Sequence, residues 1–182
     1  MMTTITISGG AKLEARLKEL SKKVAKKATL RVGFLEGATY PDGTPVATVA
    51  AIQEYGAPKV GIPPRPFFRS MVAAKKGAWG DALARSLVAA DYDATQALDL
   101  VGEGIQGQLQ ESITNLDEPA LSPVTLMLRE MFPMMSDGVQ SYKDVAEARA
   151  RVADGESADG VSTKPLVWTG HLLNSVSHEV EE

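Results

Sequence analysis

The chain has 182 residues, of which 44% are hydrophobic and 23% charged, so it is long enough for one well-packed domain. It contains no cysteine, which excludes disulfides, thiolate nucleophiles and cysteine-bound metal or iron–sulfur sites. The formal net charge of −4 argues against a dedicated nucleic-acid binder, and no apolar run approaches the ~20 residues that a membrane helix needs.

The N-terminal part predicts two short strands separated by a basic helix. Residues 3–7 and 29–36 alternate β-branched or large apolar side chains with other residues, a pattern typical of strands. Between them we expect a helix over residues 11–28, because one apolar stripe recurs at helical spacing: Leu13, Leu17, Leu20 and Val24. The lysines of this helix form either a solvated face or an electropositive surface that meets an acidic neighbour or DNA.

A short helix is expected next, over residues 46–55. Thr44 fits the N-cap position with Pro45 at the first helical position, and Gly56 supplies the C-terminal stop. The buried side chains of this helix are predicted to be Val46, Val49, Ile52 and Tyr55.

Residues 62–66 predict an extended, rigid arm rather than a flexible connector. Pro63, Pro64 and Pro66 each fix φ near −65°, and each pushes the residue before it toward an extended conformation. We expect the arm to hold four side chains in fixed relation to the two flanking helices: Arg65, Phe67, Phe68 and Arg69.

Two longer helices are predicted after the arm. In residues 67–90 one face carries Phe68, Val72, Trp79, Leu83 and Leu87, and Gly77 and Gly80 weaken this helix locally. Residues 94–116 show the strongest helical period of the chain, in Leu98, Val101, Ile105, Leu109, Ile113 and Leu116. Residues 91–93 either cap this second helix or lie within one long bent helix.

The C-terminal part is less regular. Residues 116–123 and 154–162 are loops by composition, and 142–152 predicts a charged helix. The methionine-rich segment around residues 124–161 has no firm period, so it either repacks against partners or forms a small satellite hairpin on the domain surface. Thr169 and Gly170 predict a turn, Leu172 opens a short turn or helix over residues 172–175, and residues 176–182 alternate as a closing strand.

No residue pattern predicts catalysis. Residues 102–107 match the glycine-rich dinucleotide fingerprint, but they lie inside a helical period with no strand before them. Small residues for close helix–helix or subunit contact explain these glycines better. His171 and His178 lack convergent partners and are expected to be surface or satisfied polar residues, so we predict no enzyme, no cofactor and no metal.

Several segments recur in an order and spacing that resemble a known family. They are residues 32–34, 38–44, 49–56, 62–69, 121–125, 164–166, 169–170 and 172–176. Together they resemble the tail-completion (neck) proteins of long-tailed phages and prophages, a family that includes minor tail protein Z and virion morphogenesis proteins. The chain departs from these relatives by inserting a segment at about residues 126–163.

The resemblance implies an α+β fold, with a small, mostly antiparallel sheet packed by two or more long helices. The whole chain, 1–182, would be one domain carrying the inserted satellite segment. It would act without catalysis as a virion protein, assembled in the host cytoplasm, that completes the head-proximal end of the tail. The partners would be its own subunits in a ring, with a hexamer favoured, the tail terminator, the head–tail connector, and genomic DNA that passes without sequence readout.

Residues expected to matter for structure or for subunit contact lie in three places. They are Tyr55 and Gly56, then Pro63, Pro64, Arg65, Pro66, Phe67, Phe68 and Arg69, and finally Thr169, Gly170 and Leu172. Phe67 and Phe68 would anchor the fold, and Arg65 and Arg69 are candidates for subunit contact. The basic N-terminal helix and the acidic C-terminus could supply complementary surfaces in a ring. The alternative reading is a nucleic-acid-binding module that uses the basic helix.

Overall fold

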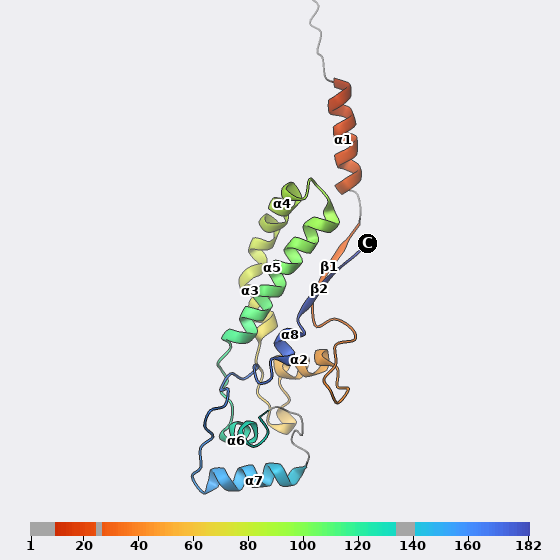
Figure 1. Cartoon of the computed structure of the whole chain (residues 1–182). Helices are drawn as coiled ribbons and strands as arrows, with labels where there is room; N and C mark the ends of the chain where they lie inside the picture. The colour runs from red at the N-terminus through yellow and green to blue at the C-terminus, as the bar shows by residue number, and fades with distance from the viewer. Residues whose placement is uncertain (1–9, 25–26, 134–140) are drawn as a thin grey trace, which may run out of the picture.

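The computed structural model describes residues 10–24, 27–133 and 141–182, and the strand predicted at residues 3–7 lies outside them. The fold is α+β as predicted, with helices packed on a two-stranded antiparallel sheet (Figure 1). In chain order the elements are α1 (Gly10–Val24), β1 (Thr29–Gly33), α2 (Val46–Tyr55), the 3-10 turn η1 (Pro58–Val60), α3 (Phe67–Lys75), the 3-10 turn η2 (Lys76–Ala78), α4 (Trp79–Ala89), α5 (Ala94–Asn115), α6 (Pro123–Met131), α7 (Tyr142–Ala153), α8 (His171–Asn174) and β2 (Ser177–Glu181).

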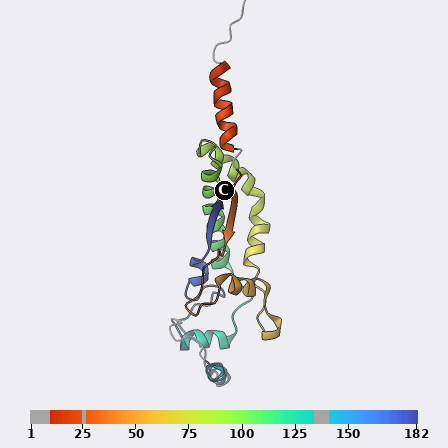
Figure 2. The ribbon, with the colours of Figure 1, turned by 90° about the vertical axis from the view of Figure 1, so that its right-hand side faces the viewer.

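The sheet pairs a strand near the start of the chain, β1, with the last strand, β2, and it lies along α5 (Figures 1 and 2). In its register Val32 stands opposite His178. Helix α5 meets the sheet at Gly102, where a Cβ atom would come within 2.5 Å of the His178 ring. The first glycine of the apparent dinucleotide fingerprint therefore permits a close approach between helix and strand.

The apolar period predicted for α5 is confirmed. Its buried side chains include Val101, Ile105, Leu109 and Ile113, which recur at helical spacing and enter the main core. Asp93 caps this helix by accepting a hydrogen bond from the Gln96 amide at 3.1 Å.

The helix predicted over residues 67–90 is interrupted. Turn η2 separates α3 from α4 at Gly77, which is a poor helix former. Asp91 and Tyr92 then adopt positive φ angles of 47° and 63°. These left-handed residues turn the chain before α5, so residues 91–93 cap a separate helix instead of continuing one bent helix.

Helix α2 has the predicted bounds but a different buried face. Its N-cap is Pro45, not Thr44, and no side chain caps it. The residues that face inward are Val46, Ala50 and Glu54, which are four apart and so lie along one line of the helix. The burial predicted for Ile52 and Tyr55 is wrong: Tyr55 is 68% exposed.

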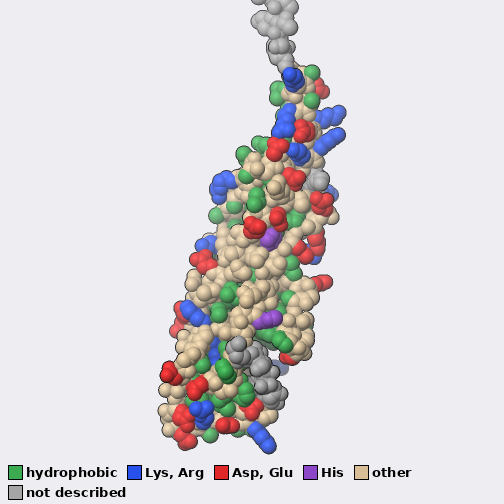
Figure 3. Space-filling model, in the orientation of Figure 1, with side chains coloured by type: hydrophobic (Ala, Val, Ile, Leu, Met, Phe, Trp, Pro, Cys, Tyr) green, Lys and Arg blue, Asp and Glu red, His purple; other side chains and the backbone are tan. Residues whose placement is uncertain are grey.

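Helix α1 projects beyond the end of α4 and α5 (Figures 1 and 2), and basic side chains gather on it (Figure 3). It ends at Val24, and residues 27–28 are not helical, so the predicted end at residue 28 is wrong. Leu13 and Leu17 are 62% and 57% exposed. The described part of the chain therefore leaves the first two leucines of the predicted apolar stripe uncovered.

Helices α6 and α7 pack against each other at the end of the molecule opposite α1 (Figure 1). The helix predicted at residues 142–152 is confirmed and extends to Ala153. Helix α6 was not predicted, although Ser122 caps it and Pro123 occupies its first turn, which is a helix-start signal. Whether the segment around residues 124–161 repacks against a partner stays a prediction.

Candidate functional site

The proline arm packs closely against the end of α2 and is hydrogen-bonded to it. Gly56 ends this helix with a φ of 75°, and a Cβ atom there would come within 2.7 Å of the Pro64 nitrogen and 2.8 Å of the Ile62 carbonyl oxygen. The Arg65 amide donates to the Gln53 carbonyl oxygen at 2.7 Å. Only glycine at position 56 lets Pro63 and Pro64 lie this close to the helix end.

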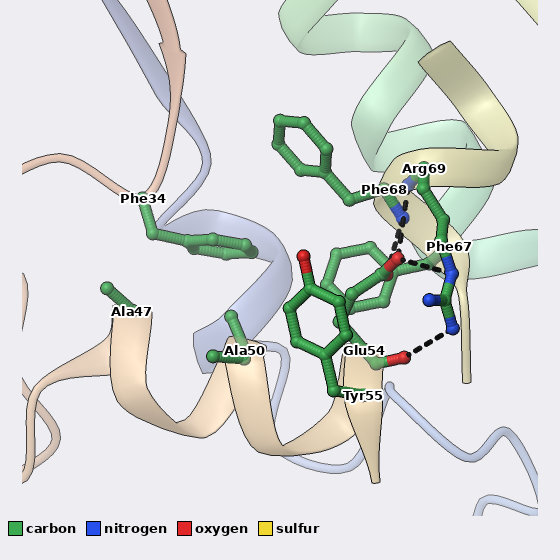
Figure 4. Close-up of a pocket in the computed structure, with 9 residues that line it drawn as sticks. Phe34, Ala47, Ala50, Glu54, Tyr55, Phe67, Phe68 and Arg69 are labelled. Atoms are coloured by element: carbon green, nitrogen blue, oxygen red, sulfur yellow. Dashed lines mark hydrogen bonds and ion pairs between the residues drawn. The ribbon is translucent and has the colours of Figure 1, made fainter. Parts of the chain in front are cut away.

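A buried carboxylate joins α2 to the start of α3, on the far side of the arm in sequence (Figure 4). Glu54, on α2, accepts hydrogen bonds from the amides of Phe68 at 2.9 Å and Arg69 at 3.2 Å. The Arg69 side chain completes the set, with its Nε atom 3.3 Å from the Glu54 carboxylate. Pro66, the N-cap of α3, offers no side-chain cap, so Glu54 satisfies the free amides and the positive end of this helix.

Glu54 was missed by the sequence reasoning. The signal for it was available, because Glu54 follows Val46 and Ala50 at intervals of four on the same helix. A carboxylate on an otherwise apolar face is informative, because a buried charge requires a partner.

Arg65 in the arm and Arg69 in α3 lie in different environments. Arg65 is 5% exposed, and it donates from Nε to the Pro119 carbonyl oxygen at 3.2 Å and from Nη1 to Gln53 Oε1 at 3.0 Å. Burial lowers the pKa of Arg65. Arg69 is exposed and lies over the Tyr55 ring, 5.3 Å from its centroid. Arg65 is therefore engaged within its own chain, whereas Arg69 remains accessible for the predicted subunit contact.

Phe67 and Phe68 line an open, mainly apolar hollow of about 220 Å³ between α2 and α3 (Figure 4). Phe67 is 1% exposed and meets Phe34 edge to face, with ring centroids 6.2 Å apart. The charged side chains of the hollow, Glu54 and Arg69, bind each other and the start of α3. Because both Glu54 oxygens bind groups of the same chain and the rest of the lining is mainly apolar, the hollow suits an apolar group.

The C-terminal turn reaches the same core as the arm. Gly170 has a φ of 77° and starts α8, and Thr169 Oγ1 accepts from the His171 amide at 3.2 Å. Leu172 is buried in the main core with Phe67. The His171 ring lies 4.5 Å from the Tyr40 ring, centroid to centroid, and its Nε2 atom is 3.0 Å from the Thr39 carbonyl oxygen.

His178 lies apart from this site, in β2. Its Nδ1 atom is 2.7 Å from Gln106 Oε1, and its Nε2 atom is 3.1 Å from Asp99 Oδ1. Both histidines are therefore satisfied polar residues, as expected. In the described part of the chain, no group of three or more His, Asp or Glu side chains is arranged to hold a metal ion.

Comparisons with protein-family models, with curated proteins and with solved structures find no match. The resemblance to neck proteins therefore stays a prediction. Among the helices of the described residues, none combines the length and apolar composition needed to cross a membrane.

Proposed function

We propose that this chain is a non-catalytic virion protein of the phage neck. In this role it is a ring subunit, in a hexamer by the family resemblance, which completes the head-proximal end of the tail and meets the tail terminator and the head–tail connector. DNA passes through the ring by loose electrostatic contact, without base readout.

One observation carries the proposal: six of the eight separated segments of the resemblance meet in a single core. Ala50, Phe67, Leu166 and Leu172 belong to four of these segments and to one buried cluster. Residues 32–34 and 38–44 pack against the same cluster through Val32, Phe34, Ala38 and Tyr40. A set of motifs that builds one core specifies an architecture, which supports a shared fold over chance similarity of scattered segments.

Exposed apolar side chains support an assembling protein. Tyr55 at the end of α2 and Val60 in η1, both just before the arm, are 68% and 72% exposed, and Leu13 and Leu17 are exposed on α1. Single exposed apolar residues are ordinary in monomers, but their presence both on the α2–η1 segment before the arm and on a projecting helix suits contact with other subunits.

The test is assembly. We expect the purified chain to form ring-sized particles in mass photometry, alone or after mixing with tail tubes or tail-terminator protein. A terminal tag should label the neck of virions in electron micrographs. A strict monomer that binds none of these components, or a tag found elsewhere in the virion, would contradict the proposal.

A second candidate function is nucleic-acid binding through α1. Lys12, Lys18 and Lys22 are exposed and form no ion pair with another described residue. A DNA titration over a range of salt concentrations tests this function. A steep inverse dependence of affinity on salt would support it, and the absence of binding at low salt would end it.

A further inference from the structure

The apolar face of helix α1 is not packed against another described element, although an amphipathic helix normally buries this face. It has 15 residues, close to the length of about 12–15 below which isolated helices are marginal in water. Arg16 and Lys23 tie it to Asp91, at 2.6 Å and 2.8 Å, beside the turn that joins α4 to α5. Its leucine stripe, defined as Leu13, Leu17 and Leu20, therefore needs a partner outside the described part of its own chain.

Helix α5 has an outer face that no other described part of the chain covers. This outer face consists of five exposed residues that share one side of the helix: Leu100, Glu103, Gly104, Gly107 and Glu111. A Cβ atom at Gly104 or Gly107 would meet nothing within 4 Å, unlike one at Gly102. Glycine weakens a helix interior relative to alanine, so these two glycines carry a cost that close approach of another helix would offset.

The charges of the two helices are complementary. Helix α1 has five basic and two acidic residues, and two of the basic ones, Arg16 and Lys23, are paired with Asp91. Helix α5 has three acidic residues and no lysine or arginine. Glu103 and Glu111 on the outer face form no ion pair with another described residue. The acidic C-terminus is a weaker partner, because Arg31 lies 2.7 Å from Glu181 and 3.7 Å from Glu179 in the same chain.

We propose that the leucine stripe of α1 in one copy docks on the outer face of α5 in a second copy, with closest approach at Gly104 and Gly107. The occupant is a second copy because α1 points away from its own α5 while Asp91 holds it (Figures 1 and 2). The contact is heterologous, because α1 of one copy meets α5 of the next and the two surfaces differ. Repeating this contact from copy to copy can close a ring. The inference rests on the ring assembly in the proposed function and names its surface.

The first test distinguishes a loss of close helix–helix contact between copies from a loss of folding stability. In sedimentation velocity with the full chain, we expect Gly104→Gln with Gly107→Gln to weaken self-association at least about tenfold. The same pair should raise the melting temperature, because glutamine is a better helix former and has open space at both sites. The matched control is Gly80→Gln on α4, an exposed helical glycine with equally open space, which should raise the melting temperature and leave association unchanged.

The second test shows that the contact joins two copies. A chain with Leu13→Asp and Leu17→Asp keeps its α5 face, and the glutamine pair keeps its α1. Each should be monomeric alone, and their mixture should form heterodimers through the one intact contact. A mixture that stays monomeric, or a parent chain that is monomeric at about 100 µM, would overturn the inference. A parent that forms rings unaffected by either variant would also overturn it while leaving the proposed function intact.

Discussion

At the scale of single residues, the two adjacent phenylalanines that follow the arm have different roles. Phe67 is 1% exposed and packs edge to face on Phe34. Phe68 is only half-buried and lies along the open hollow, with its ring 3.6 Å from the position that a Cβ atom of Gly33 would take. Phe67 is therefore part of the core, whereas Phe68 can also meet a partner.

We predict that Phe67→Ala lowers the free energy of unfolding by about 3–5 kcal/mol, because it leaves a cavity in the core. Phe68→Ala should cost less, since solvent already reaches part of its ring. Urea denaturation of both variants measures the difference. Tyr55→Ala, at a site 68% exposed, is the control with little expected change. Equal losses at positions 67 and 68 would contradict this division of roles.

At the scale of elements, the rigidity of the arm depends on how closely it meets α2. Gly56 and Gly61 both have positive φ, 75° and 74°, but their ψ angles differ: 20° places Gly61 in the left-handed region, whereas 171° places Gly56 in a region that is essentially open to glycine alone. They differ in their surroundings: only at Gly56 would a Cβ atom collide with backbone atoms. Gly56 therefore combines a glycine-only backbone conformation with close packing, whereas Gly61 has the left-handed conformation alone.

Gly61→Ala should destabilise the fold by about 1–2 kcal/mol, the cost of the left-handed conformation alone. Gly56→Ala should cost clearly more, because its backbone conformation excludes L residues and because the arm would also have to move away from α2. Chemical denaturation of the two variants in parallel gives both values. If the two losses are the same, the arm is not held against the helix end as the structure has it.

The attachment of α1 depends on one carboxylate, and this gives it a pH dependence. A hydrogen bond from Lys23, together with the charge of Arg16, lowers the pKa of Asp91 in the folded chain. A carboxyl group with a lowered pKa stabilises the attachment above its unfolded pKa of about 3.9 and loses this effect as the pH falls through the folded value. The attachment should therefore persist near neutral pH and fail below about pH 4.

Because the chain has no cysteine, spin labels placed at Lys18→Cys and Arg85→Cys can report the position of α1 relative to α4. The label-to-label distance distribution should be narrow near neutral pH and broad in acid. Asp91→Asn should broaden it near neutral pH, whereas Asp81→Asn, on the first turn of α4, should not. A narrow distribution in the Asp91→Asn variant would show that α1 is held by other contacts.

At the scale of the whole molecule, Arg129 connects the α6–α7 pair to the core. It is 5% exposed and donates to the carbonyl oxygens of Ser162, Lys164 and Pro165 at 2.6, 2.9 and 3.2 Å. Its guanidinium also lies over Trp168, 5.6 Å from the ring centroid. Burial, and the nearby positive charge of Arg65, lower the pKa of Arg129. The segment that it binds leads directly into α8 and the main core.

Arg129→Lys should destabilise the protein by about 2–3 kcal/mol, because an ammonium group cannot reproduce the planar fork that spans these carbonyls. Thermal unfolding measures the loss, and hydrogen exchange should locate it in residues 162–168. Arg149→Lys, on the exposed side of α7, is the control. A loss no larger than that of the control would show that the two parts are joined by other contacts.

Much of the secondary structure could be predicted from the sequence because its signals are local. The period of α5, the bounds of α2 and the final strand follow from repeats of apolar residues and from Gly56 and Pro45 at the ends of α2. The arm was also predictable, since three prolines restrict it whatever surrounds it. Helix α6 was missed because its apolar residues show no firm period, although Ser122 and Pro123 mark its start.

The candidate site was predicted only in part. Proline and glycine at the arm, and the phenylalanines that follow, were identified by their backbone and packing preferences. The partners of the arm were not, because Glu54, Gln53 and the Pro119 carbonyl come from other segments. A hydrogen bond between distant segments depends on how helices pack, which a single periodic pattern does not contain.

By itself, therefore, the sequence determined where helices, strands and the rigid arm occur, since these depend on backbone preferences over a few neighbouring residues. Only the tertiary structure decided which face of α2 turns inward, which arginine is enclosed and which of the α5 glycines the sheet contacts. It also showed that the stripe of α1, periodic enough to predict a buried face, projects from its own chain. The physical reason is that an amphipathic pattern indicates which face of a helix should be buried, but the packing of the whole chain decides what buries that face.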